Sequence, residues 1–350
     1  MRNLQSLPNG WRKVKLREWI ELKYGFGLSE EKRVKGNVPV YGSSGIVGYH
    51  NKPAVNTQGI IIGRKGNVGA VYFSNKSFYP IDTVYFIDAL KKKGDLKFFY
   101  YLLKTIDFKK VDINVGVPGL NRDTAHSLEV TIPEDINEQK RIAEVLSAFD
   151  DKIELNNKII KTLEEMAQEI FKEWFVKNQK SKIKNKKLGE LASIKYGQGP
   201  AASKLKKGGY PVYGANGVIG YFDSYDFSER QIIIGCRGVV GNVTLTLPRC
   251  LVTHNSLVIT PRNNRKIFFY YLLKNQNLDA VVGGSAQPQI TITDLERLEL
   301  LMPDEKIQDE FESIVVNMEQ KRLILFYENQ KLAALRDLLL PKLMSGEVRV

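Results

Sequence analysis

The stretch Pro39-Val-Tyr-Gly-Ser-Ser-Gly-Ile-Val-Gly-Tyr49 is repeated 172 residues later as Pro211-Val-Tyr-Gly-Ala-Asn-Gly-Val-Ile-Gly-Tyr221. The run Phe-Phe-Tyr-Tyr-Leu-Leu-Lys also occurs twice, beginning at Phe98 and at Phe268. Self-similarity over this length indicates two copies of one domain and not a short-period solenoid. Because the copies are similar but not identical, we expect them to recognise two similar but different targets.

The composition is that of a folded protein with a strong positive charge. The 350 residues leave room for two domains, and 43% hydrophobic with 26% charged residues is typical of a globular chain. A net charge of +13 predicts a polyanionic partner. We favour nucleic acid over a membrane surface because no basic amphipathic segment, lipidation motif or membrane-spanning run is found. The alternative is that the charge only aids solubility. Without a signal-peptide pattern, a cytoplasmic location is expected.

Each half of the chain follows the same plan of mixed α and β structure. An opening element, at 16–24 and again at 188–196, leads through a Gly- and Lys-rich loop to short runs of Ile, Val and aromatic residues. Such runs predict strands. The strands are expected at 59–63, 70–73, 82–87, 231–235, 243–247 and 256–260, and an aromatic helix at 96–104 and 266–274. Each half ends at a boundary proline, Pro133 or Pro303.

After each boundary proline the sequence predicts a long helix. In the first helix, ten positions step by four and three residues without a slip, which is the heptad pattern of a coiled coil. These seam positions are Ile142, Leu146, Phe149, Ile153, Asn156, Ile160, Leu163, Ala167, Ile170 and Trp174. A poorer second seam runs from Phe311 to Leu343 and is interrupted by Arg322, Asn329 and Arg336.

The predicted fold class is therefore α+β: two similar mixed α/β domains joined by two long helices, which pair either with each other, as an antiparallel coiled coil, or with helices of a partner. If the helices pair with their midpoints aligned, facing residues have numbers that add up to about 485, which places Asn156 opposite Asn329. Two asparagines inside an apolar seam fix register and direction at some cost in stability. The alternatives are that each Asn points to solvent or caps a local bend, or that the helices pair with those of a partner.

Four segments follow from this plan: a first recognition domain at 1–136, a first helix at 137–178, a second recognition domain at 179–304, and a second helix with the C-terminal tail at 305–350. The segment 177–187 holds six lysines in eleven residues and has no apolar periodicity. Mutual repulsion between these charges favours a solvated connector.

The residues predict no catalytic site. The chain has no Walker-type phosphate loop and no [Asn/Asp]-Pro-Pro-[Tyr/Phe] tetrapeptide of amino-methyltransferases. Cys236, Cys250 and His254 lack the spacing of a zinc site, so we expect no bound metal. The two cysteines are interpreted as buried apolar residues. We therefore expect a binding protein and not an enzyme.

Polar residues in the loops are the candidates for contact with DNA bases and phosphates. Arginine addresses guanine in a bidentate manner, lysine more often meets phosphate, and amides read adenine. The candidates are Ser43, Ser44, Arg64, Lys65, Asn67, Asn121, Arg122, Asn216, Arg237, Ser285, Gln287 and Gln289. For each residue alone, a role in a turn or a solvent-facing side chain is the alternative. As a set they stand out because the two copies keep the same turn glycines but have different polar residues at the positions between those glycines. Tyr41 and Tyr213, identical in both copies, are interpreted as framework.

In this order of motifs the chain resembles the specificity subunit of type I restriction-modification systems. The resemblance rests on the paired Pro-Val-Tyr-Gly-x-x-Gly stretches, the segment Gly284-Ser-Ala-Gln-Pro-Gln-Ile290, the boundary Ile132-Pro-x4-Glu-Gln-x-x-Ile142 and the ending Leu340-Pro-Lys-Leu-Met-Ser-Gly-Glu347. The second boundary departs from the pattern, with Ile307-Gln308 in place of Glu138-Gln139.

The resemblance implies two target recognition domains, each reading one half of a split, asymmetric site in double-stranded DNA. It implies that the helices form an antiparallel coiled coil, set the gap between the halves and dock DNA adenine methyltransferase (modification) subunits. It also implies that restriction/translocase subunits join the complex. S-adenosylmethionine, ATP and Mg would then belong to these partners, with no cofactor and no catalytic residue in this chain. The rivals are a protein-interaction scaffold with duplicated binding domains and a stand-alone enzyme with an unrecognised site.

Overall fold

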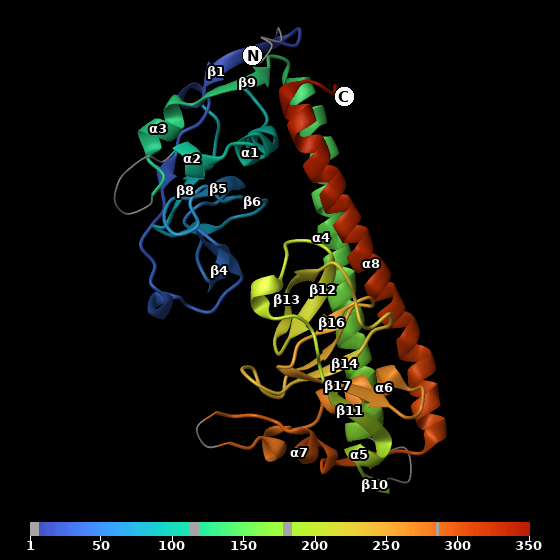
Figure 1. Cartoon of the computed structure of the whole chain (residues 1–350). Helices are drawn as coiled ribbons and strands as arrows, with labels where there is room; N and C mark the ends of the chain where they lie inside the picture. Colours follow the sequence, from blue (N-terminus) through green and yellow to red (C-terminus); the bar gives the residue numbers. More distant parts are fainter. Residues whose placement is uncertain (1–6, 112–118, 178–183, 285–286) are drawn as a thin grey trace. The chain divides into compact units, whose positions relative to one another are not determined.

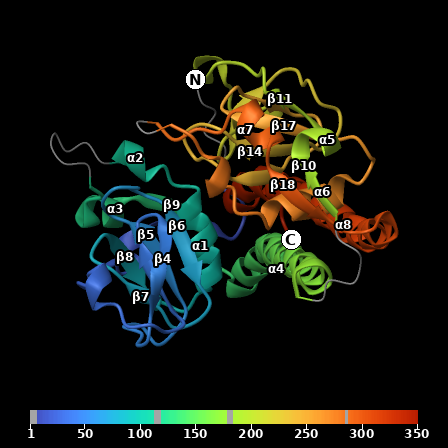
Figure 2. The same cartoon turned by 90° about the horizontal axis from the view of Figure 1, so that it is seen from below.

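The computed structural model describes residues 7–111, 119–177, 184–284 and 287–350, and Figures 1 and 2 show the chain from two directions. The chain forms two compact units. The first unit comprises residues up to 155 together with 329–350, and the second comprises 156–328. Each unit contains one mixed α/β domain and one half of each long helix, so the division cuts both helices and the four predicted segment limits stay a prediction.

The first unit carries three small sheets and an aromatic helix. Its strands are β1 (Trp11–Lys15), β2 (Lys23–Tyr24), β3 (Val38–Gly42), β4 (Gly45–His50), β5 (Gly59–Gly63), β6 (Val71–Ser74), β7 (Tyr79–Pro80), β8 (Val84–Ile87) and β9 (Glu129–Pro133). Its short helices are η1 (Leu16–Glu18), η2 (Glu30–Lys32), α1 (Leu96–Lys104), α2 (Phe108–Val111) and α3 (Arg122–Ser127). The sheets have the orders β2-β8-β5-β6, β4-β3-β7 and β1-β9, and β3 and β7 run parallel.

The second unit repeats this topology strand for strand. Its strands are β10 (Lys184–Lys187), β11 (Ala192–Tyr196), β12 (Tyr210–Gly214), β13 (Gly217–Phe222), β14 (Ile232–Gly235), β15 (Val243–Leu245), β16 (Leu251–Val252), β17 (Ser256–Pro261) and β18 (Glu299–Met302). Its short helices are α5 (Leu188–Leu191), η4 (Ala202–Lys204), α6 (Lys266–Lys274), η5 (Asp279–Val281) and α7 (Ile292–Glu296). The orders β11-β17-β14-β15, β13-β12-β16 and β10-β18 match those of the first unit, with β12 parallel to β16. The predicted duplication is confirmed.

The repeated stretch 39–49 forms the β3–β4 hairpin, and 211–221 forms the β12–β13 hairpin. The tyrosine of each hairpin is buried, with 7% of Tyr41 and 5% of Tyr213 exposed. The hydroxyl of Tyr213 accepts a hydrogen bond of 2.9 Å from the Leu247 amide. Both tyrosines therefore belong to the framework, as predicted.

The lysine-rich segment 177–187 is more structured at its end than predicted. Residues 184–187 form β10, which pairs antiparallel with β18 as β1 pairs with β9 in the first unit. All four side chains of β10 are exposed, because the lysines extend into water while the main chain completes the ladder. Charged side chains are common on edge strands. Because residues 184–187 pair with β18, the interpretation of these four residues as a connector was wrong.

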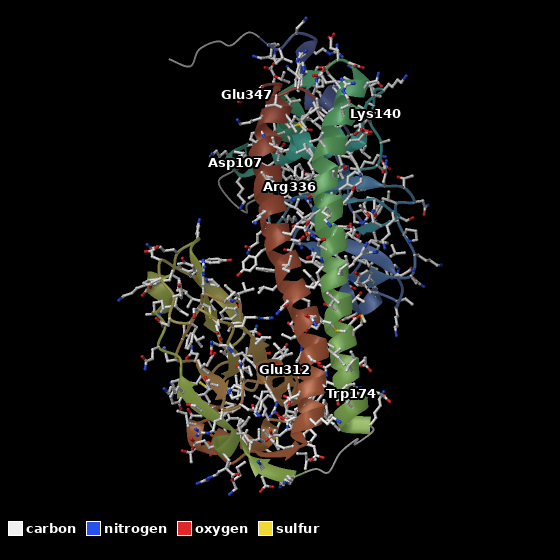
Figure 3. All side chains as sticks on the ribbon, turned by 90° about the vertical axis from the view of Figure 1, so that its right-hand side faces the viewer. Asp107, Lys140, Trp174, Glu312, Arg336 and Glu347 are labelled. Carbon is white, nitrogen blue, oxygen red and sulfur yellow. The ribbon has the colours of Figure 1, made fainter. Side chains whose placement is uncertain are left out.

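The long helices are α4 (Ile136–Lys172), followed by a π-helical turn η3 (Glu173–Lys177), and α8 (Glu305–Ser345). In each unit their halves lie side by side and antiparallel (Figure 3). Arg336 of α8 pairs with Asp150 of α4 in the first unit, and Arg322 pairs with Glu164 at 2.7 Å in the second. The residue numbers of both pairs add up to 486, next to the predicted 485. Each of the ten positions in either predicted seam is buried or half-buried, so both registers are confirmed.

The seam is shared with a third helix in each unit. The Cα atoms of α4 and α8 mostly lie more than 8 Å apart, and aromatic side chains fill the space. In the second unit, Phe171 of α4 and Phe311 of α8 are 5.6 Å apart between ring centroids, and both contact Phe268 of the aromatic helix α6. In the first unit, α1 shares one core with Ile142 and Leu146 of α4. The heptad pattern thus serves the packing of each recognition domain as well as the pairing of the long helices.

Asn156, at the predicted register position, is fully buried and donates a hydrogen bond of 3.1 Å to the carboxylate of Glu328. The solvent-facing alternative is therefore wrong for this residue. Asn329 belongs to the other unit, and its pairing with Asn156 stays a prediction.

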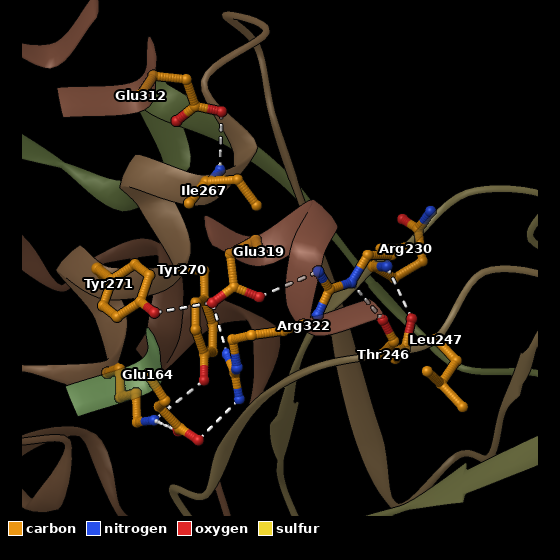
Figure 4. A network of polar contacts seen from close by, with 12 residues as sticks. Glu164, Arg230, Thr246, Leu247, Ile267, Tyr270, Tyr271, Glu312, Glu319 and Arg322 are labelled. Atoms are coloured by element: carbon orange, nitrogen blue, oxygen red, sulfur yellow. Dashed lines mark hydrogen bonds and ion pairs between the residues drawn. The ribbon is translucent and has the colours of Figure 1, made fainter. Parts of the chain in front are cut away.

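A buried carboxylate lies where α6 meets α8 in the second unit. Only 1% of the Glu319 side chain is exposed, and it accepts hydrogen bonds from the Tyr271 hydroxyl at 2.8 Å and from Arg322 at 2.5 Å (Figure 4). Arg230 donates to its second oxygen at 3.1 Å. Burial and the neighbouring Glu319 raise the pKa of Tyr271, so its hydroxyl stays protonated and donates. A buried charge of this kind is tolerated only while its donors remain.

Replacing one donor should therefore destabilise the protein. We expect Arg322→Met to lower the free energy of unfolding by about 2 kcal/mol, since it leaves the Glu319 charge with fewer partners and also breaks the pair with Glu164. The control Lys161→Met breaks an exposed pair with Glu165 and should cost about 0.5 kcal/mol or less. Urea unfolding followed by circular dichroism measures both; equal losses in the two variants would contradict the role of the buried pair.

Candidate nucleic-acid interface

Three loop segments of the first unit come together at one end of the four-stranded sheet. The turn between β5 and β6 begins at Arg64, and the Arg64 carbonyl accepts a hydrogen bond of 2.9 Å from the Leu120 amide. Lys65 and Gly119 form an isolated antiparallel bridge. The β3–β4 turn reaches the same place, because a Cβ atom on Gly66 would lie 3.2 Å from the Ser43 hydroxyl. The candidates of the first copy thus share one surface.

The turn that carries Arg64 and Lys65 depends on glycine in both copies. Gly66 has a φ of +75° and its counterpart Gly238 has a φ of +80°, a conformation that residues with a Cβ rarely adopt. The glycines at 63, 66 and 69 therefore belong to a tight turn between two antiparallel strands, β5 and β6.

Two arginines lie over one exposed tyrosine in the first unit. The guanidinium carbons of Arg64 and Arg122 are each 5.3 Å from the ring centroid of Tyr24, half of which is exposed. Arg64 also donates to the Asp82 carbonyl at 2.7 Å, which fixes its direction. Burial, together with Tyr24, raises the pKa of Tyr85 to about 12, so the neutral Tyr85 hydroxyl donates to the Leu120 carbonyl at 3.0 Å. The result is a stacked, positively charged surface.

The remaining candidates of the first unit differ in what they offer. Lys65, Asn67 and Ser44 are exposed, and Ser43 is half-buried, with its carbonyl accepting from Tyr72 at 3.3 Å. Asn121 is the N-cap of α3, and its side-chain oxygen accepts from two main-chain amides at 2.9 and 3.0 Å. This oxygen is committed to the cap, so only the NH₂ group of Asn121 remains for a ligand.

In the second unit the equivalent surface carries one arginine and several amides. Arg237 is exposed, lies 6.0 Å from the ring of Tyr196, and forms a bridge with Gln289. Asn216 is exposed in the β12–β13 turn, which the Asn242 amide secures by donating to the Ala215 carbonyl at 3.2 Å.

The loop before α7 carries the other candidates of the second unit. Gln287 is exposed, whereas the main chain of Gln289 pairs with Gly283 at 2.8 and 2.9 Å. Ser285 lies outside the described residues. The bridge between Gln289 and Arg237 therefore brings this loop to the turn that carries Arg237, and Gln287 is an exposed residue of the same loop.

The two copies differ in charge at equivalent places. The positions of Arg64 and Arg122 are taken by Cys236, which is fully buried, and by Ile292. The first copy therefore presents two guanidinium groups over its tyrosine, and the second presents one. Different base preferences follow from different donors on the same framework.

Tyr24 and Tyr196, which lie under the arginines, were missed by the sequence reasoning. Their signal was available: each ends its opening element at the same offset of 172 residues and is followed by a glycine, Gly25 or Gly197. A Cβ atom on either glycine would lie within 2.2 Å of a main-chain carbonyl oxygen in the adjacent segment, that of Ile81 for Gly25 and that of Val252 for Gly197. The glycines permit the close approach that sets the tyrosines at the sheet edge.

The cysteines are buried and contact different partners. Cys236 lies 3.6 Å from the His254 carbonyl, and Cys250 lies 3.3 Å from the Thr246 hydroxyl. Burial raises the pKa of both thiols, which disfavours the thiolate that metals and electrophiles require. Within the described parts of the chain, no three His, Cys, Asp or Glu side chains lie close enough together to hold a metal ion.

The fold and these surfaces define a protein with two related binding domains on a shared pair of helices. The family model for the type I restriction modification DNA specificity domain matches residues 8–165 and 180–332, so the chain belongs to this family and carries two copies of its domain. No helix within the described residues is long and apolar enough to cross a membrane.

Individual relatives agree with this assignment. The chain is 28% identical over 323 residues to the type I restriction enzyme MjaIX specificity subunit of Methanocaldococcus jannaschii, covering 76% of this chain and 72% of the relative. It is 24% identical to the HindI specificity subunit of Haemophilus influenzae, covering 66% and 71%. The crystal structure of a type I restriction-modification S subunit from M. genitalium has the same fold, with a TM-score of 0.68 at 22% identity over 97% of this chain and 98% of that one.

A histidine links this surface to the opening element. The Leu22 amide donates to Nε2 of His126, on α3, at 3.1 Å, which requires that nitrogen to be unprotonated. Burial, with the positive charges of Lys91 and Arg122, lowers the pKa of His126 from its ordinary value of 6.5. Because the folded-state pKa is depressed, the neutral form contributes stability above the unfolded pKa. This contribution is lost as the pH falls from 6.5 through the folded-state pKa.

The thermal stability of the first unit should therefore fall between about pH 7 and pH 5, in part through His126. We expect His126→Gln, whose side-chain oxygen can still accept from Leu22, to show a smaller fall over this window. The matched control His254→Gln, at an exposed position of the other unit, should keep the wild-type dependence. Melting temperatures measured across this pH range test the prediction. If the melting temperature of His126→Gln fell with pH as steeply as that of the wild type, His126 would not be the cause of the fall.

Proposed function

We propose that this chain is the DNA-recognition subunit of a type I restriction-modification complex and reads a split, asymmetric sequence. The first domain reads one half through the surface of Arg64, Arg122 and Tyr24. The second domain reads the other half through the surface of Arg237, Asn216 and Gln287. The observation that carries the proposal is the difference between these two surfaces on a duplicated framework, in a chain of the DNA specificity family.

The electrostatics support this role. Arginine over an aromatic ring is held in a defined direction and can still reach guanine, whereas Lys65 is free to meet phosphate. The net charge of +13 supplies the sequence-independent part of the affinity, which weakens with salt. The duplicated-scaffold alternative has no comparable support, because the family match is to DNA specificity.

The long helices are proposed to set the gap between the half-sites and to dock DNA adenine methyltransferase subunits. Their exposed faces retain large apolar side chains, among them Leu155, Met166, Ile314 and Leu338, which are between 41% and 61% exposed. Restriction/translocase subunits would join the same assembly. S-adenosylmethionine, ATP and Mg are assigned to these partners, and no catalytic step is assigned to this chain.

Methylation sequencing of a host that expresses this chain with its modification subunit tests the reading of half-sites. We expect Arg64→Gln to relax or change the sequence of one half-site, and Arg237→Gln to change only the other. Loss of a bidentate contact should reduce discrimination about 10- to 100-fold at one position. Lys93→Gln, at an exposed position in the loop before α1, removes the same charge away from both proposed surfaces and is the control. If either arginine variant altered both half-sites, the division of labour between the domains would be refuted.

The role of the helices has a separate test. Seven residues inserted after Asn156, together with seven inserted after Tyr327, lengthen the helix pair by about 10 Å. The gap in the methylated sequence should then grow by about three base pairs, while the half-site sequences stay the same. Insertion into α4 alone breaks the register and should abolish methylation. A longer helix pair with an unchanged gap would contradict the spacer role.

A further inference from the structure

The first unit contains a cavity that the proposed DNA contacts do not use. It has a volume of about 400 Å³ and lies between the β3–β4 hairpin, β6, α1 and α4. Its lining includes Tyr41, Tyr49, Phe73, Tyr100, Asp150 and Asp151. Aromatic walls with carboxylates among them are the surroundings that proteins offer to organic cations.

The second unit shows what occupies the equivalent place. The repeat relates Tyr41 to Tyr213 and Ser74 to Thr246 at the offset of 172 residues. It also relates the hydrogen bond of 2.7 Å from Tyr101 to Asp150 to the bond of 2.8 Å from Tyr271 to Glu319. The two carboxylates are therefore structural counterparts.

In the second unit this place is filled by the chain's own guanidinium. Arg230, whose side chain is 20% exposed, donates to Glu319 at 3.1 Å and to the Thr246 carbonyl at 2.9 Å (Figure 4). It precedes β14 by two residues. At the offset of 172 residues its counterpart in the first unit is Gln58, which directly precedes β5 and is exposed. The first copy thus keeps the acceptor and lacks the cation.

The first copy also has more carboxylate side chains around the cavity than the second copy has at the equivalent place. Asp151 lines its cavity where the second copy has Gln320, and Glu154 lines it where the second copy has Leu323. Lys76 and Lys97 also line the cavity, together with the three carboxylates of α4.

The hydrogen bonds to the two carboxylates show the same difference. Asp150 accepts from Tyr101 and Arg336, whereas Glu319 accepts from Tyr271, Arg322 and additionally Arg230. One donor fewer reaches the carboxylate of the first copy.

We propose that the cavity of the first unit binds a guanidinium group from outside the chain, held by Asp150 and the surrounding tyrosines as Arg230 is held by Glu319. The group has two sources, a free guanidinium compound or an arginine side chain of another protein. The proposal is independent of DNA recognition, because neither Gln58 nor Asp150 belongs to the proposed DNA surface.

Isothermal titration calorimetry of the full chain tests the proposal with two probes, agmatine and N-acetyl-arginine amide. We expect the wild type to bind one equivalent with millimolar affinity, as a single charged group confers. Gln58→Arg should fill the cavity from within and abolish binding, whereas Gln58→Ala should leave it intact. Arg230→Gln should open the equivalent place and add a second equivalent. The melting temperature of Arg230→Gln should be lower than that of the wild type, and added agmatine should raise it again.

The probes distinguish the sources. Binding of agmatine alone indicates a free metabolite, and binding of N-acetyl-arginine amide indicates an arginine of a protein. No binding to the wild type, or equal binding to the wild type and Gln58→Arg, would overturn the proposal.

Discussion

A hydrogen bond from a tyrosine to a buried or half-buried carboxylate, made once in each unit, joins the recognition domain to the long helices. Tyr101 donates to Asp150 of α4, and Tyr271 donates to Glu319 of α8. The aromatic helix that carries each tyrosine packs into the core that α4 and α8 share. A domain anchored in this way cannot rotate on the helices without exposing its aromatic core and orphaning a charge, and both are costly. The position of each loop surface within its unit follows from this anchor.

The anchor also explains why the buried framework is the same in both copies while the loop side chains differ. Buried tyrosines, turn glycines and the strand order are fixed by packing, so a change at one of them is felt throughout the unit. The side chains at Arg64, Arg122 and Arg237 lie on loops beyond the sheet edge, where substitution costs little stability. One framework can therefore carry two different sets of donors, and its cavity can be filled in one copy and left open in the other.

The sequence predicted much of this architecture for identifiable reasons. The repeat gave the two domains, and the three-four spacing gave both seams, because heptad periodicity records which helix face is buried. The antiparallel direction of the helices was implied by the resemblance to the family and not by the spacing. It did not predict β10, since a run of lysines carries no alternation from which an edge strand can be recognised. Nor did it predict that the seams would be shared with α1 and α6, because periodicity shows that a face is covered but not by which element.

The amino-acid sequence by itself determined the duplication, the fold class, the long helices and the loops on which the candidate residues lie. Only the tertiary structure decided that Arg64 and Arg122 share one tyrosine, that Asn121 is committed to a helix cap, and that Arg230 fills a place that Gln58 leaves open. These outcomes depend on contacts between segments far apart in the chain, and on which donors lie within hydrogen-bond distance of a buried acceptor. Local pattern does not encode such distances, because they are set by the packing of the whole unit.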